Sequence, residues 1–241
     1  GVSIEALAEL LRHHRVSACL FMLNFANPTG ARMPDARRRE LVELLTRHQV
    51  PLIEDDVYAE LHFGQRAPLS SKAVDTTGLV MHVSSFSKSL APGYRAGWVA
   101  AGRYAGLVQR QKFSLSLATT IPVQMALAEY LKQGSFDKHL RQLRQTLARQ
   151  EAELAGAVSR CFPAGTRLAR PQGGYFQWLE LPGQVDALLL HREALQQGIS
   201  IAPGPVFSAK REFGNYIRLN FGHADVQPAV ARLGELISRQ L

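Results

Sequence analysis

The chain has 241 residues, of which 46% are apolar and 20% charged, and its 28 basic side chains outnumber 20 acidic ones, giving a formal charge of +8. This composition excludes a disordered chain, because enough apolar side chains are present for one large or two smaller cores. No apolar run approaches the roughly 18 residues that a membrane-spanning helix needs, so we expect a cytoplasmic protein without a membrane partner. Cys19 and Cys161 are far apart in the sequence and are interpreted as core cysteines, not as a disulfide framework or a metal site.

The basic excess does not by itself indicate nucleic-acid binding. Acidic residues are interleaved with the basic ones of two predicted helices, and this pattern favours solvated helix faces over a phosphate-binding patch. The residues concerned are Arg37, Arg38, Arg39, Glu40, Glu43, Arg141, Arg144, Arg149 and Glu151. Only six of the 28 basic residues are lysines, so a lysine in an unusual place is a candidate functional residue.

The first half of the chain alternates short apolar runs with a helical pattern. The apolar runs are typical of strands buried on both faces. They cover residues 17–23, 50–53, 79–83 and 96–101. A helix is predicted over residues 34–48, because three leucines recur at helical spacing and Pro34 suits a first turn. Such alternation favours an α/β fold with a mostly parallel sheet.

The second half begins with helices and ends with a mixed pattern. Helices are predicted over residues 121–130 and 136–158, and the second is long and polar, as expected of a helix that links two domains. Strands are predicted over 167–170, 174–181, 199–202 and 216–221, and helices over 185–197 and 226–240. We therefore predict one domain over residues 1–134 and a smaller α+β domain, with the linking helix, over residues 135–241.

Two polar motifs directly follow predicted strands. The first, Asn27–Gly30, has the composition of a turn, and a turn alone would account for it. The second runs from Glu54 through Asp55 and Asp56 to Tyr58, at the carboxyl end of a strand, where open α/β sheets bind ligands. Three consecutive carboxylates suit either a divalent cation or a solvated loop, although a magnesium site has no need of the tyrosine.

A lysine-containing motif follows the third predicted strand. Ser84–Lys88 is followed by Pro92–Arg95, so hydroxyls, backbone N–H groups and a guanidinium gather at one strand end. This set suits a phosphate dianion. The sequence lacks the G-x-x-x-x-G-K-[ST] pattern of a nucleotide P-loop. A phosphate-binding loop whose lysine is not a nucleophile is the alternative interpretation.

The fourth candidate is Arg218, in the middle of the apolar strand predicted over residues 216–221. A charged side chain in such a strand is costly unless it meets an anion. Arg218 is therefore expected either to pair with an internal carboxylate or to bind the carboxylate of a ligand.

In this order and spacing, the four motifs resemble the active-site series of the fold-type I pyridoxal-phosphate (PLP) enzymes, the class I/II aminotransferase family. The resemblance implies an α/β protein of PLP-dependent transferase fold type I. Residues 1–134 would be the C-terminal part of the PLP-binding large domain, with a truncated, mostly parallel sheet. Residues 135–241 would be the small C-terminal α+β domain. The implied cofactor is PLP, and no metal is expected.

The resemblance also implies a role for each site residue. Lys88, Asp55 and Tyr58 would be the catalytic residues: Lys88 would form the Schiff base and Asp55 would pair with the pyridinium nitrogen. Asn27 and Tyr58 would hydrogen-bond the phenolic oxygen of the ring. Ser85, Ser87 and Arg95 would hold the phosphate. Arg218, together with Asn27, would bind the carboxylate of the substrate. These roles are chemically consistent, because an ionised Asp55 keeps the ring protonated as an electron sink and a released lysine can move the Cα proton.

Three segments narrow the resemblance within the family. Ser85–Arg95, Arg170–Phe176 and Ile201–Phe207 resemble the aminotransferase-like domains of MocR-type regulators of the GntR family. These regulators join a winged helix-turn-helix to a PLP-binding domain that senses an amino acid or amine by forming an imine with it. The resemblance thus implies an effector-sensing domain, a homodimer, and DNA binding only through an N-terminal domain outside these residues. The alternative is part of an aminotransferase of the aminoadipate type, which would move an amino group between an amino acid and a 2-oxo acid, so enzymatic activity stays open.

Two family features are not found before Asn27: the glycine-rich phosphate cup and an aromatic residue that stacks on the ring. We therefore expect the chain to be a C-terminal fragment with an uncovered sheet edge and weak affinity for PLP.

A third hypothesis, a structural or protein-binding module without a ligand, predicts that Lys88 is unreactive.

Overall fold

The computed structural model describes all residues from 1 to 241 and divides into two compact units. Unit 1 comprises residues 1–26 and 31–142, and unit 2 comprises residues 27–30 and 143–241. The short segment Asn27–Gly30 therefore belongs to unit 2, although both of its neighbours in the chain belong to unit 1. No helix combines the length and apolar character that a membrane crossing requires.

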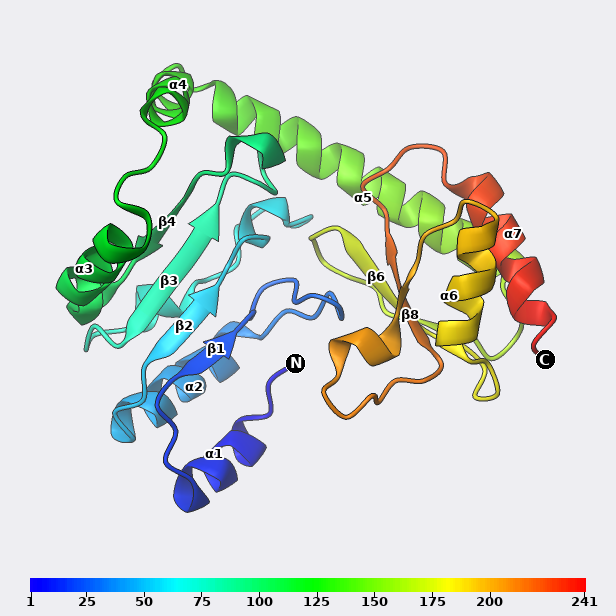
Figure 1. The fold of residues 1–241 in the computed structure, drawn as a ribbon, viewed down its shortest axis with the longest axis horizontal. Helices are drawn as coiled ribbons and strands as arrows, with labels where there is room; N and C mark the ends of the chain where they lie inside the picture. Colours follow the sequence, from blue (N-terminus) through cyan, green and yellow to red (C-terminus); the bar gives the residue numbers. More distant parts are fainter. The chain divides into compact units, whose positions relative to one another are not determined.

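Unit 1 contains a four-stranded sheet in the order β1-β2-β3-β4 (Figure 1). The strands are β1 (Cys19–Phe21), β2 (Leu52–Asp55), β3 (Val80–Ser85) and β4 (Gly97–Ala100). The first three are parallel and β4 is antiparallel to β3. The predicted α/β class and mostly parallel sheet are confirmed. Three further elements join the strands: the 3-10 helices Ala59–Leu61, Ser71–Val74 and Pro92–Tyr94.

Two helices pack beside β1 and β2 and form the main core of unit 1. They are α1 (Ile4–His13) and α2 (Asp35–Arg47), which lie near β1 and β2 in Figure 1. Helix α1 begins at Ser3, whose hydroxyl accepts a hydrogen bond from the Ala6 amide at 3.1 Å, as a helix N-cap does. Leucines of α1 and α2 are buried against β1, β2 and the start of β3. This core anchors the strands whose ends carry the candidate site.

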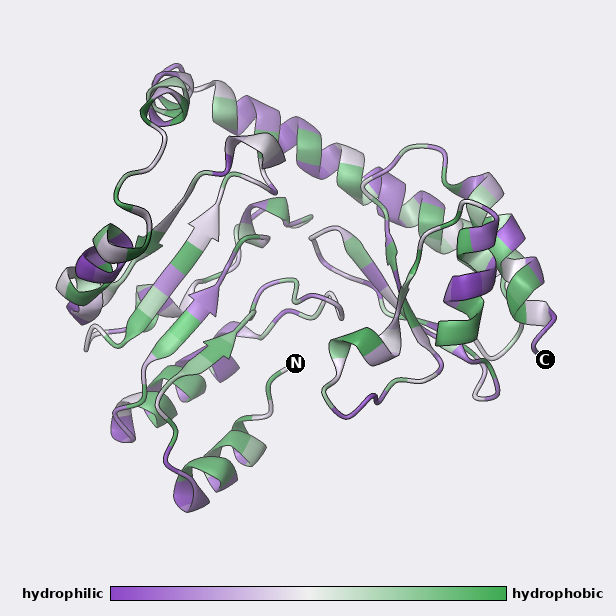
Figure 2. Ribbon diagram, in the orientation of Figure 1, coloured by the Kyte–Doolittle hydropathy of each residue, from purple (hydrophilic) through white to green (hydrophobic).

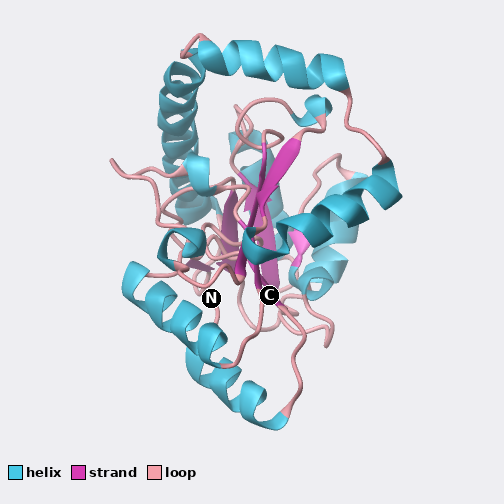
Figure 3. Cartoon of the chain, turned by 90° about the vertical axis from the view of Figure 1, so that its left-hand side faces the viewer, coloured by secondary structure: helices cyan, strands magenta, loops and turns pink.

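The opposite edge of the sheet is exposed. All four residues of β4 are exposed, so the prediction that this strand is buried on both faces is wrong. The reason is that β4 is an edge strand, paired only with β3. The helices that follow, α3 (Ala105–Ser116) and α4 (Ile121–Lys132), are joined by a short loop (Figure 3). Helix α3 has no buried residue.

Helix α5 (Ser135–Cys161) is the longest element and confirms the predicted long helix. Figure 2 shows hydrophobic and hydrophilic residues alternating along it, and its buried positions include Leu147, Leu154 and Ala155. Glu151 is also buried, so its predicted place on a solvated face is wrong. Its carboxylate accepts a hydrogen bond from the Gln177 amide at 2.8 Å.

Unit 2 is built on a second four-stranded sheet, in the order β5-β6-β8-β7. The strands, all paired antiparallel, are β5 (Arg167–Leu168), β6 (Phe176–Glu180), β7 (Ala202–Pro203) and β8 (Tyr216–Asn220). Two helices, α6 (Ala187–Gln196) and α7 (Gln227–Ser238), complete the unit. The predicted strand over residues 199–202 is largely absent, because the Ile199 amide instead bonds to the Ala194 carbonyl at 2.9 Å and closes the end of α6.

Candidate functional site

The carboxyl ends of β2 and β3 bring two of the predicted motifs to one edge of the sheet in unit 1. The strands are parallel, and Asp55 lies opposite Val83 in the register. The segment Asp56–Tyr58 therefore follows β2 beside Ser84 and Ser85, which end β3, and the chain leaves β3 at Phe86–Lys88. This is the edge at which open α/β sheets bind ligands.

Asp55 is the half-buried carboxylate of this edge. Its Oδ1 accepts a hydrogen bond from the Val57 amide at 3.4 Å. Desolvation raises the pKa of Asp55, and the nearby negative charge of Asp56 adds to that rise. A partly desolvated carboxylate is stabilised in its ionised form by a cationic partner, so Asp55 suits the protonated nitrogen of a pyridinium ring. Tyr58, three residues on, is buried.

The segment between β3 and β4 presents Lys88 and the phosphate-binding candidates. After Ser85 the chain turns back, with the amides of Leu90 and Ala91 donating to the Phe86 carbonyl at 2.9 and 3.0 Å. Lys88 is exposed within this turn. Gly97 begins the return strand so close to β3 that a side chain would place Cβ 2.7 Å from the Ser84 carbonyl oxygen, so only glycine fits there.

Arg95 turns toward the hydroxyls of the same segment. Its backbone is left-handed, with φ of 51°, and its Nη1 donates to Ser87 Oγ at 3.3 Å and to the Pro92 carbonyl at 3.4 Å. The guanidinium and a serine hydroxyl are thus brought together as exposed donors. Such convergence suits a phosphate dianion. With Asp55 and Lys88 at the same edge, the chemistry of the donor set in unit 1 fits PLP.

Arg218 and Asn27 lie together in unit 2. Arg218 is half-buried in β8, and its Nη1 donates to Asn27 Oδ1 at 2.6 Å. Its guanidinium carbon lies 4.1 Å from the centroid of the Phe176 ring and 5.1 Å from that of Phe207. Cation–π contacts of this kind hold a guanidinium in a fixed plane. The Asn27–Pro28 peptide bond is cis, and Gly30, with φ of +66°, approaches Pro171 closely.

The predicted site residues thus fall into two groups. Unit 1 contains Asp55, Tyr58, Ser85, Ser87, Lys88 and Arg95, and unit 2 contains Asn27 and Arg218. The phosphate-binding and catalytic assignments all involve unit 1, and the carboxylate-binding assignment involves unit 2. Shared hydrogen bonding of Asn27 and Tyr58 to one cofactor oxygen stays a prediction.

Two alternatives that the sequence left open are resolved by the surroundings of Glu54. This residue is fully buried and forms an ion pair with Arg38, while both of its carboxylate oxygens accept hydrogen bonds from the Ser71 amide. Glu54 is therefore neither part of a cation site nor of a solvated loop, and no cluster of three or more metal-ligating side chains is present. Arg38 is likewise fully buried, so the prediction that it lies on a solvated helix face is wrong.

Sequence reasoning did not identify the aromatic partners of Arg218 or the buried partners of Asp56. Phe176 and Phe207 looked like ordinary apolar residues. His82, inside an apolar run, hydrogen-bonds Asp56 at 2.9 Å. A polar residue at a strand position that should be buried was the one available signal for His82, since buried polar side chains are almost always hydrogen-bonded.

Comparison with known proteins gives one family and two kinds of relative. The model of the family "Aminotransferase class I and II" matches residues 1–233. The HTH-type transcriptional regulator YdcR of Escherichia coli, described as uncharacterized, is 43% identical over 100% of this chain and 52% of its own length. The 2-aminoadipate transaminase of Thermus thermophilus is 33% identical over 98% of this chain and 61% of its own length. The chain thus spans about half to three fifths of the length of these relatives.

Solved structures of aminotransferases have the same fold. The α-aminoadipate aminotransferase LysN of Thermus thermophilus, solved with N-(5'-phosphopyridoxyl)-L-leucine, superposes with a TM-score of 0.93 at 30% identity. A multiple substrate aminotransferase from Thermococcus profundus also gives a TM-score of 0.93 at 30% identity. The match covers 100% of this chain in both cases, and 63% and 62% of the two solved chains. The predicted fold type is thereby confirmed.

Proposed function

Because the chain belongs to the aminotransferase class I and II family, we propose that it binds PLP and serves as the effector-sensing domain of a MocR-type transcriptional regulator. One arrangement supports PLP binding. Asp55 stands at the end of β2, and the Ser85–Arg95 segment begins at the end of the adjacent strand β3. A lysine, a partly desolvated carboxylate and a set of phosphate donors occur at one sheet edge.

Each residue of unit 1 has a distinct task in this proposal. PLP, when bound, supplies an electron sink for charge that develops at the Cα of an amino compound. Asp55 holds the proton on the ring nitrogen through a charge-assisted hydrogen bond. Ser85, Ser87 and Arg95 bind the phosphate and so orient the ring. Until an amino compound binds, Lys88 Nζ would hold the cofactor covalently. Once the amino group of that compound has displaced it, Lys88 would move a proton at Cα as general base and acid, while Tyr58 would donate to the phenolic oxygen.

Arg218 is proposed to bind the α-carboxylate of the effector. Its planar guanidinium can hold a carboxylate through two parallel hydrogen bonds. The Asn27 amide oxygen and the rings of Phe176 and Phe207 already fix its orientation within unit 2, so little freedom is lost on binding. The proposed effector is therefore an amino acid or an amine that carries a carboxylate.

The sensor role is favoured over an enzymatic one by the pattern of relatives. YdcR is 43% identical across the whole chain and YjiR, another HTH-type regulator of Escherichia coli, is 36% identical. The transaminases are 30 to 33% identical. The DNA-binding part of the full-length regulator would lie outside these residues. The alternative function is transamination between an amino acid and a 2-oxo acid, supported by the transaminases among the relatives.

Titration of the full-length protein with PLP tests the proposal. The wild type should shift the visible absorbance of PLP, because Lys88 forms a covalent bond with its aldehyde carbon, and Lys88→Ala should abolish the shift. Lys132→Ala, which replaces an exposed lysine in the last turn of α4, should behave as the wild type. No shift in the wild type, or an equal shift in Lys88→Ala, would refute PLP binding through Lys88.

The response of the PLP-loaded protein to an added amino acid separates the sensor from the enzyme. A sensor should bind the amino compound with a spectral change and release no 2-oxo acid, while its affinity for operator DNA changes. Stoichiometric formation of a 2-oxo acid from a panel of α-amino acids would favour the aminotransferase instead. Both assays use the same protein preparation, so they compare the two functions directly.

A further inference from the structure

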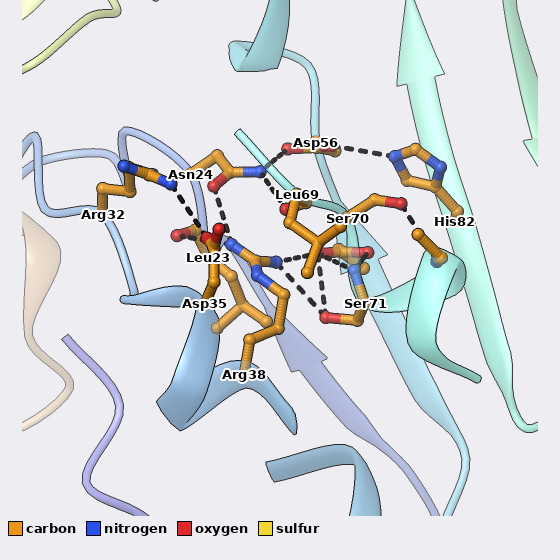
Figure 4. A network of polar contacts seen from close by, with 12 residues as sticks. Leu23, Asn24, Arg32, Asp35, Arg38, Asp56, Leu69, Ser70, Ser71 and His82 are labelled. Atoms are coloured by element: carbon orange, nitrogen blue, oxygen red, sulfur yellow. Dashed lines mark hydrogen bonds and ion pairs between the residues drawn. The ribbon is translucent and has the colours of Figure 1, made fainter. Parts of the chain in front are cut away.

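A buried polar network in unit 1 includes Asp56, the residue next to Asp55 in the chain (Figure 4). Arg38 reaches from α2 into its centre and forms an ion pair with Glu54. Its Nη2 also donates to Asn24 Oδ1 at 2.7 Å. Asn24 in turn donates to Asp56 Oδ1 at 2.9 Å, and His82 Nε2 lies 2.9 Å from Asp56 Oδ2. The sequence predicted none of these pairings.

Asp56 is held in this network through both its side chain and its backbone. Besides the contacts of its two carboxylate oxygens, its amide donates to the Val83 carbonyl at 2.9 Å and its carbonyl accepts from Ser84 Oγ at 3.3 Å. Asp56 is 4% exposed. The neighbouring Asp55 has a single hydrogen bond to its carboxylate, the long one from Val57. Since consecutive side chains of a strand point to opposite faces, Asp56 anchors the backbone from which Asp55 projects.

A proton on His82 would balance the charges around Asp56. The charged groups that act on the imidazole are Glu54 of β2, Asp56 just after β2, and Arg38 of α2. The uncharged Trp98 ring of β4 meets the imidazole edge-on, with centroids 5.1 Å apart. Two buried carboxylates thus face one arginine. A protonated His82 supplies the second positive charge, which a buried cluster of this kind needs to avoid an unpaired charge.

The pKa of His82 agrees with this role. Burial would lower the pKa of the imidazole, but the hydrogen bond to Asp56 and the charges of Asp56 and Glu54 outweigh burial and raise it. The favourable pairing of His82 with Asp56 is therefore fully present at a pH below the ordinary pKa of histidine. It is lost as the pH rises through the raised pKa of His82. Loss of that proton removes the positive charge beside Asp56, even where the neutral imidazole still donates from Nε2. Asp56 is then less tightly held, and its uncompensated charge acts on Asp55.

We propose that His82 is a positioning residue: by donating from Nε2 to Asp56 it fixes the Asp55–Tyr58 segment and so sets how tightly the pyridinium ring of PLP is held. The inference rests on the proposed function of Asp55 as the partner of the ring nitrogen. If His82 only filled space between β2 and β4, replacing it would leave the pH dependence of PLP binding the same as in the wild type.

The test is the dissociation constant of PLP for the full-length protein, measured across the pH range in which His82 loses its proton. The wild type should lose affinity as the pH rises, by about tenfold, the value of one charge-assisted hydrogen bond. His82→Gln retains a donor that does not titrate, so it should lack this step. His82→Leu should bind weakly at every pH. His48→Gln, which replaces an exposed histidine beyond α2, should keep the wild-type profile.

A second measurement needs no cofactor. In the PLP-free protein, NMR should show that Asp56→Asn lowers the pKa of His82. His82→Leu should speed hydrogen exchange of the Asp56 and Val57 amides. A His82→Gln profile identical to the wild type, or unchanged amide exchange and PLP affinity in His82→Leu, would overturn the inference. If the wild type binds no PLP, the proposed function is refuted, and so is the effect of His82 on PLP affinity. The amide exchange would still report whether His82 holds the Asp56 backbone.

Discussion

Arg218 shows how one strand position gathers partners from separate segments of the chain. An arginine in the middle of β8 is flanked along the chain by the buried residues Ile217 and Leu219, and its own side chain points to the other face of the sheet. There its guanidinium makes cation–π contacts with two phenylalanine rings and donates to Asn27. The sequence predicted that this arginine needs an anion or a partner. It could not predict the rings, because Phe176 and Phe207 come from separate segments that only the fold brings together.

Replacing Arg218 by lysine should weaken the binding of α-amino acids to the PLP-loaded full-length protein. The ammonium keeps the charge but loses the planar pair of donors and the stacking on the rings, so we expect about tenfold weaker binding, the equivalent of one hydrogen bond to a charged group. Spectral titration with a panel of α-amino acids measures the change. Arg192→Lys, an exposed position on α6, is the matched control. Equal affinities in Arg218→Lys and the wild type would remove the carboxylate-binding role.

At the scale of elements, the pairing of α2 with β2 depends on a buried charge pair. The fully buried Arg38 of α2 faces the fully buried Glu54 of β2. Burial lowers the pKa of Arg38 and raises that of Glu54, and the opposite charge of each partner works against the shift. The pair was not predictable, since Arg38 is flanked by two further arginines in a segment whose charge pattern indicates a solvated face. Only the position of Leu41, Leu44 and Leu45 could have shown that Arg38 shares their inward face.

Arg38→Met should destabilise the protein by about 3–5 kcal/mol, because it leaves a carboxylate buried without its counter-ion. The double variant Arg38→Met/Glu54→Leu should recover most of that loss, since an apolar pair needs no compensation. Chemical denaturation followed by circular dichroism measures both. The neighbouring exposed variant Arg39→Met should change stability by no more than about 0.5 kcal/mol. An Arg38→Met protein as stable as Arg39→Met would show that Glu54 finds another partner or takes up a proton at little cost.

Most elements of the two units were predictable because their apolar patterns are strong. The strands β1 to β3, helix α2, the long helix α5 and the helices α6 and α7 all bury a regular stripe or run of apolar residues. Two helices were missed for different reasons. Helix α1 carries a readable signal, a serine N-cap followed by Ile4, Leu7 and Leu11. Helix α3 carries none, because it buries no residue and so has no apolar stripe.

The candidate site was more predictable than the packing around it. Asp55, Lys88 and Arg95 were singled out because their motifs stand at the ends of predicted strands, where ligands bind, and their roles stay a prediction. The exposed β4 was not foreseen, because an apolar strand pattern does not reveal what covers the strand. The side chains exposed on β4, α3 and α4 include Trp98, Leu107, Phe113, Leu115, Ile121 and Met125.

The central claim, that Lys88 holds PLP covalently, is tested most directly by trapping the bond. The full-length protein is incubated with PLP, reduced with borohydride, digested, and searched by mass spectrometry for a phosphopyridoxyl group. We expect the group on the peptide containing Lys88 and none in Lys88→Ala. Modification spread over exposed lysines such as Lys112 and Lys132, unchanged by Lys88→Ala, would contradict it.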